Sequence, residues 1–78
     1  MTREELKNKI VEQYKVTINK ENYIKIYYNG IMMEINFGNK INIYVEEFPN
    51  KNNNYLCNRY YKTTDNAYVA IIRLLENE

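Results

Sequence analysis

Residues that commonly carry enzyme or metal chemistry are scarce in this sequence. It contains no histidine, and Cys57 is its single cysteine. Histidine is the commonest general base and metal ligand, and one cysteine builds neither a disulfide framework nor a zinc site of the usual spacing. The two glycines, Gly30 and Gly38, each fall in an expected turn, so no glycine-rich loop remains to cradle a phosphate. We therefore expect no enzyme activity, no metal and no cofactor.

Two remaining candidates for reactive chemistry have simpler explanations. Cys57 has only Arg59 and Lys62 nearby and no base, so we interpret it as a small strand residue. Glu34 and Glu46 are expected on an open sheet surface, which offers no deep cleft to separate the pKa values of paired carboxylates. Neither feature changes the expectation of a protein without catalysis.

Long apolar runs and a strong charge of either sign are also missing. The longest unbroken apolar run, Ala67–Ile72, is too short to cross a bilayer, and the first residues lack the pattern of a signal peptide. The formal net charge of +1 gives no global attraction for nucleic acid. Since 78 residues suffice for one modest core, we expect a single cytoplasmic domain over residues 1–78, with no membrane contact.

A helix is predicted near the start of the chain. Thr2 and Glu5 have the spacing of a capping box, in which each side chain bonds the other residue's backbone N–H. Apolar side chains then recur on one face of a helical pattern. This pattern predicts a helix over about residues 3–15, with an apolar stripe of Leu6, Ile10, Val11 and Tyr14.

A second helix is predicted near the end of the chain, over about residues 66–76. Thr64 or Asp65 is expected to cap its first turn. Arg73 is the only charge inside this helix, so we expect neighbouring elements to cover most of its circumference. Its apolar residues are Ala67, Tyr68, Ala70, Ile71, Ile72, Leu74 and Leu75.

Between the two helices, the sequence predicts antiparallel hairpins. Asn29-Gly30 is the strongest two-residue hairpin signal, because both residues tolerate the positive φ that such a turn requires. At the second turn, a loop of residues 38–40 sets Phe37 opposite Ile41 and keeps the apolar residues aligned. A shift of one residue there would move every side chain of the strand to the other face.

This alignment sorts the strand residues onto two faces. One face is apolar and is expected to pack under both helices, whereas the other is expected to meet solvent. The inner set is Ile24, Ile26, Tyr28, Ile31, Met33, Ile35, Phe37, Ile41, Ile43 and Val45, and the outer set is Tyr23, Lys25, Tyr27, Met32, Glu34, Asn36, Asn42, Tyr44 and Glu46.

The predicted fold class is α+β, with a three- to four-stranded antiparallel sheet and the N- and C-terminal helices packed on one face. The element order is α-β-β-β-(β)-α. Residues 16–18 are either a short strand or a connector, and residues 55–62 are interpreted as a fourth strand at an edge of the sheet.

The outer sheet face is the first candidate binding surface. Tyr27, Met32 and Tyr44 are expected to form an apolar strip on it, flanked by charged residues. Tyrosine and methionine are enriched in interface cores, which favours a protein partner or a homodimer. The alternative is that these tyrosines are only good strand formers that tolerate water.

The second candidate surface is the segment 50–62. Its cations, Lys51, Arg59 and Lys62, carry the positive excess of the chain and are interleaved with tyrosines such as Tyr60. Basic residues neutralise phosphates and aromatic rings stack on bases, so this mixture suits a nucleic acid. The alternative is a solvated loop rich in asparagine.

The order of the predicted elements and the chain length resemble the double-stranded-RNA-binding domain. That family grips phosphates with a lysine cluster at the start of its last helix. The matching positions here, residues 63–66, read Thr-Thr-Asp-Asn and offer no cation. The resemblance therefore implies a topology, and no RNA-binding residue is transferred from it.

The chain is also similar to small anti-defence proteins of phages and mobile elements, among them the anti-CRISPR proteins. The similarity lies in its size, its composition and its small antiparallel sheet flanked by helices. Asparagine, lysine, isoleucine and tyrosine make up 41 of the 78 residues, and their AT-rich codons indicate a low-GC genome. This resemblance implies an inhibitor that sterically blocks a host nuclease or effector complex. The alternative function is a small nucleic-acid-binding protein that uses residues 50–62.

Overall fold

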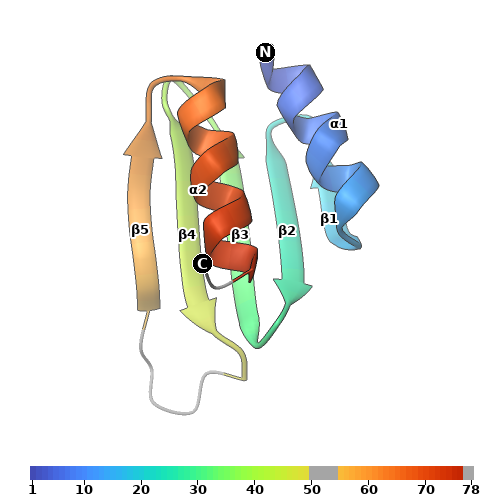
Figure 1. Cartoon of the computed structure of the whole chain (residues 1–78), viewed down its shortest axis with the longest axis vertical. Helices are drawn as coiled ribbons and strands as arrows, with labels where there is room; N and C mark the ends of the chain where they lie inside the picture. Colours follow the sequence, from blue (N-terminus) through green and yellow to red (C-terminus); the bar gives the residue numbers. More distant parts are fainter. Residues whose placement is uncertain (50–54, 77–78) are drawn as a thin grey trace.

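In the computed structural model, which describes residues 1–49 and 55–76, a five-stranded antiparallel sheet carries two helices on one side (Figure 1). The α+β class, the antiparallel sheet and the position of both terminal helices are confirmed. The elements in chain order are α1 (Arg3–Gln13), β1 (Val16–Lys20), β2 (Tyr23–Tyr28), β3 (Ile31–Phe37), β4 (Ile41–Glu47), β5 (Tyr55–Tyr61) and α2 (Thr64–Glu76).

The sheet keeps its strands in chain order, from β1 at one edge to β5 at the other. It has one more strand than the upper limit of the prediction, because residues 16–18 belong to a strand that pairs with β2 and are not a connector. The strand predicted at the far edge is confirmed as β5, which pairs with β4.

The register of the central hairpins is the predicted one. Asn29 and Gly30 have φ values of 53° and 79°, as the tight turn between β2 and β3 requires. The loop between β3 and β4 sets Phe37 opposite Ile41, so the two strands keep their aliphatic residues on the same face. The sorting of residues between the two faces follows from this register.

The core fills the space between the sheet and the helices. Leu6 and Ile10 of α1, and Ile71 and Leu75 of α2, are fully buried against the aliphatic residues of the strands. Figure 1 shows α1 in front of β1 and β2, and α2 in front of β3 and β4. The buried strand residues are Ile24, Ile26, Ile31, Met33, Ile35, Phe37, Ile41, Ile43 and Val45.

One residue of the predicted inner set is not sealed in this core. Tyr28 lies on the helix side of the sheet, but 41% of it is exposed. It occupies the last position of β2, beside the turn, where its ring packs edge-on against Tyr14 at a centroid distance of 5.0 Å. The helices therefore cover the middle of the sheet more completely than this end.

Both helix starts are capped, and both differ slightly from prediction in their limits. The capping box at the start of α1 is confirmed: Thr2 Oγ1 accepts from the Glu5 N–H at 3.0 Å, and the Thr2 N–H donates to Glu5 Oε1 at 2.8 Å. The helix ends at Gln13, two residues earlier than expected. At α2 the cap is Thr63, whose hydroxyl accepts from the Asn66 N–H at 3.2 Å, so neither of the two predicted residues caps this helix.

The far ends of the two helices are joined by a hydrogen bond. Tyr14, just after α1, donates its hydroxyl to Glu76 Oε2 at 2.6 Å. Burial of the ring, together with Glu76, raises the pKa of Tyr14 well above its usual value. The contact closes one end of the helical layer over the sheet.

Candidate interaction surface

The side of the sheet opposite the helices is the first candidate site, and we call it the open face. Strand alternation and register determine which side chains it carries. All nine residues predicted for the outer set belong to it, and the pairing of β1 with β2 and of β5 with β4 adds four more. The open face comprises Ile18, Lys20, Tyr23, Lys25, Tyr27, Met32, Glu34, Asn36, Asn42, Tyr44, Glu46, Asn58 and Tyr60.

Two hydrogen bonds between tyrosine and glutamate side chains fix the positions of two tyrosine rings on the open face. The Tyr23 hydroxyl donates to Glu34 Oε2, and the Tyr44 hydroxyl donates to Glu46 Oε2 at 2.6 Å. Partial burial and the bond to Glu34 raise the pKa of Tyr23 to about 12, because both favour the neutral phenol. These bonds restrict the side chains before any partner arrives, which lowers the entropy lost on binding.

A row of asparagines crosses the open face from β3 to β5. Asn36 Nδ2 donates to Asn42 Oδ1 at 3.2 Å, and Asn42 Nδ2 donates to Asn58 Oδ1 at 2.8 Å. Asn42 Nδ2 also lies 3.2 Å from the carbonyl oxygen of Arg59. The row is polar without being charged, so it can exchange hydrogen bonds with a partner at a lower desolvation cost than charged groups would incur.

An aromatic pair forms the opposite end of the open face. The rings of Tyr27 and Phe48 meet edge-on at a centroid distance of 4.7 Å, and Lys25 Nζ lies 5.4 Å from the centre of the Tyr27 ring. Tyr27 is 38% exposed and Phe48 is 53% exposed. The sequence pattern did not place Phe48 on this face. The available signal was an aromatic residue directly after a strand and before a proline.

Met32 is on the predicted face but is not an accessible anchor. Only 7% of this residue is exposed. It lies directly between Tyr27 on β2 and Glu46 on β4, and the side chains at these flanking positions leave it little surface. Of the apolar strip predicted on the open face, only the two tyrosines are accessible, because Met32 lies beneath the surface.

The second candidate surface is the segment 50–62, which we call the basic segment. Its described residues are divided between the two faces of the sheet. Tyr60 lies opposite Asn42 and belongs to the open face, where it is 63% exposed. Arg59 lies opposite Ile43 and so emerges on the helix side. Lys62 follows the end of β5 and is exposed, and Lys51 lies outside the described residues. Strand alternation thus separates a cation from the aromatic ring that follows it in the chain.

The open face offers a broad surface of mixed chemistry. The open face combines tyrosines, amides and a near balance of lysine and glutamate. In residues 1–49 and 55–76, no three histidine, cysteine, aspartate or glutamate side chains gather as metal ligands would. No helix in this described part of the chain is long and apolar enough to span a membrane.

Comparisons with protein-family models, with curated proteins and with solved structures found no match to this chain.

Proposed function

We propose that this protein is a non-enzymatic interaction protein that binds a protein partner through the open face. The observation that carries the proposal is a face without a helix that presents several tyrosines, among them the exposed Tyr27 and Tyr60, and Tyr44, whose hydroxyl is held by Glu46. Tyrosine supplies a large, rigid contact area with one polar end, and it is enriched among residues that dominate binding energy. Tyr27, Tyr44 and Tyr60 are the expected anchors.

The charges of the open face favour a protein over a nucleic acid as the partner. Glu34 and Glu46 lie on the central strands of this face, where they would repel phosphates. Arg59 lies on the other side of the sheet from Tyr60, so this cation cannot meet a phosphate beside a base that stacks on the Tyr60 ring. Binding of a nucleic acid by residues 50–62 is the less favoured alternative.

We further propose that the partner is a host nuclease or effector complex, and that the protein is an inhibitor from a phage or mobile element, of the anti-CRISPR type. The support is the small α+β architecture and a sequence without histidine. The mechanism is steric: the open face covers a nucleic-acid channel or a moving element of the effector complex. Such an inhibitor acts in a fixed stoichiometry with its target and needs no cofactor.

The proposal is tested by adding the purified protein to a panel of CRISPR effector complexes and other defence nucleases with their DNA substrates. We expect cleavage by one of them to fall linearly with added protein and to stop at a fixed molar ratio. Tyr44→Ala should weaken inhibition by about 30-fold, the scale of a dominant interface residue, while the variant stays folded. Full inhibition by a folded Tyr44→Ala variant would remove the open face as the binding site.

Two measurements distinguish the alternatives. A titration with single- and double-stranded DNA and RNA at two salt concentrations detects a nucleic-acid-binding protein, whose affinity falls steeply with salt. Light scattering detects a homodimer. Nucleic-acid binding that is lost in a Lys62→Ala variant, without inhibition of any nuclease, would replace the proposed function.

A further inference from the structure

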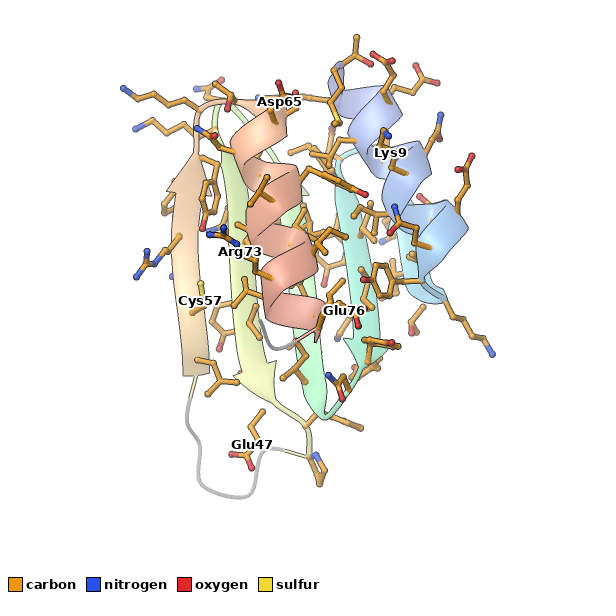
Figure 2. The ribbon with its side chains drawn as sticks, viewed as in Figure 1. Lys9, Glu47, Cys57, Asp65, Arg73 and Glu76 are labelled. Atoms are coloured by element: carbon orange, nitrogen blue, oxygen red, sulfur yellow. The ribbon has the colours of Figure 1, made fainter. Side chains whose placement is uncertain are left out.

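A groove of about 480 Å³ runs between β5 and α2, on the helix side of the sheet. Figure 2 shows Arg73 extending from α2 toward β5, and Cys57 on the strand beside it. This flank of α2 was expected to be covered, but 48% of Val69 is exposed. The groove is lined by Leu56, Cys57, Arg59, Tyr61, Asn66, Val69, Ala70, Arg73 and Leu74.

The groove combines exposed apolar surface with uncompensated positive charge. Leu56 on β5 is 56% exposed and Val69 on α2 is 48% exposed, and both side chains line the groove. Arg59 and Arg73 contribute a guanidinium group from each wall, and no carboxylate lines the groove. The one ion pair in the described part of the chain joins the Met1 amino group to Asp65, so neither arginine has an acidic partner there. An apolar groove with these charges is complementary to an apolar segment that carries carboxylates.

The side of the groove formed by β5 is also an unpaired edge of the sheet. β5 is the last strand in the sheet order and pairs only with β4 among the described strands. An edge strand presents a row of N–H and C=O groups that another extended segment can pair with. Alternate side chains of such an added strand would enter the groove beside α2, since side chains alternate between the two faces of a sheet.

We propose that the groove binds an extended acidic segment of a partner protein, which adds to β5 as a sixth strand. Its carboxylates pair with Arg59 and Arg73, and an apolar side chain packs against the exposed apolar side chains that line the groove. A second copy of this chain is the wrong occupant, because pairing of β5 with its own copy would bring four guanidinium groups together across the two-fold axis. This surface lies on the other side of the sheet from the open face and does not depend on the proposed inhibition.

The probe is a fluorescein-labelled peptide, Thr-Glu-Thr-Leu-Thr-Glu-Thr, which places two carboxylates and one leucine on the same side of a strand. Fluorescence anisotropy with the full-length protein should show saturable binding that weakens as salt rises. The control peptide has lysine in both glutamate positions and should not bind. Absence of saturable binding of the acidic peptide up to about 1 mM would overturn the proposal.

Arg73→Glu should weaken binding of the acidic peptide by about tenfold or more and produce binding of the lysine peptide. Lys15→Glu is the matched control, because it makes the same charge change at an exposed position outside the groove and should leave the affinity unchanged. Thermal melts confirm that both variants are folded. An equal loss of affinity in the two variants would show that net charge alone causes the effect, and it would overturn the proposed site.

Backbone pairing is tested with two N-methylated forms of the acidic peptide. Methyl groups on the nitrogens of glutamate and leucine block one edge of the added strand, and methyl groups on the threonine nitrogens block the other edge. Strand addition predicts that one form keeps its affinity and the other loses it. Equal binding by both forms would show that the segment does not pair with β5.

Discussion

The two faces of the sheet differ sharply in composition, although the same five strands form both. The helix-covered face is almost wholly aliphatic, and most of its residues are completely buried. The open face consists of tyrosines, asparagines and charged residues joined by side-chain hydrogen bonds. The covered face excludes water, whereas the open face retains groups that can exchange bonds with water for bonds with a partner.

This difference assigns stability and recognition to separate sets of residues. Burial of the aliphatic side chains supplies most of the free energy of folding. The polar contacts of the open face contribute modestly to stability, since exposed hydrogen bonds replace bonds with water. Substitutions on one face should therefore change stability, and substitutions on the other should change binding.

The largest expected effect comes from neighbouring residues that point to opposite faces. Ile35 is fully buried between Ile24 and Ile43, so Ile35→Ala should lower the free energy of unfolding by about 2–5 kcal/mol. Asn36 is exposed on the open face, and Asn36→Ala should change it by about 0.5 kcal/mol or less. Urea unfolding followed by circular dichroism gives both values. Similar losses would contradict the division between the faces.

Met32 is the exception that sharpens the comparison, because it belongs to the open face by register but is buried. Met32→Ala should lower the free energy of unfolding by about 2 kcal/mol, as expected for a buried side chain. The control on the same face, Tyr60→Ala, should cost about 0.5 kcal/mol or less, because most of its ring is exposed. If Met32→Ala is as mild as Tyr60→Ala, the methionine is accessible and regains its predicted place as an anchor.

A smaller effect concerns the tyrosine–glutamate hydrogen bonds, of which two lie on the open face and one lies on the helix side. The pKa of Tyr23 is raised to about 12 in the folded state. Its stabilising contribution is therefore complete below the usual value of about 10 and is lost as pH rises from 10 to 12. A spectrophotometric titration of phenolate absorbance should lose its step near pH 12 in Tyr23→Phe and keep the later ionisation of Tyr14. An unchanged titration in this variant would mean that Tyr23 ionises elsewhere.

The sequence predicted the features that depend on local rules. Asn29-Gly30 set the hairpin, and the three-residue loop before Ile41 fixed the register of the next strand. Because side chains alternate in a strand, these two turns determined which residues face the helices. The capping box of Thr2 and Glu5 was likewise readable from spacing alone.

The features that depend on neighbours from distant parts of the chain were not predictable. Burial of Met32 requires the sizes of the residues on two adjoining strands. Strand alternation separates Arg59 from Tyr60, but the face that each takes depends on the register of β5 against β4, which the composition of residues 50–54 does not fix. Exposure of Val69 depends on how far α2 lies from the sheet edge, which no helical pattern specifies.

The most direct test of a protein-binding open face compares adjacent tyrosines of similar exposure. Tyr27 and Tyr28 are 38% and 41% exposed, and they point to opposite sides of the sheet. In titrations against the inhibited effector complex, Tyr27→Ala should weaken binding by about 30-fold, and Tyr28→Ala should bind like the unmodified protein. Equal affinities, or a loss confined to Tyr28→Ala, would contradict recognition through the open face.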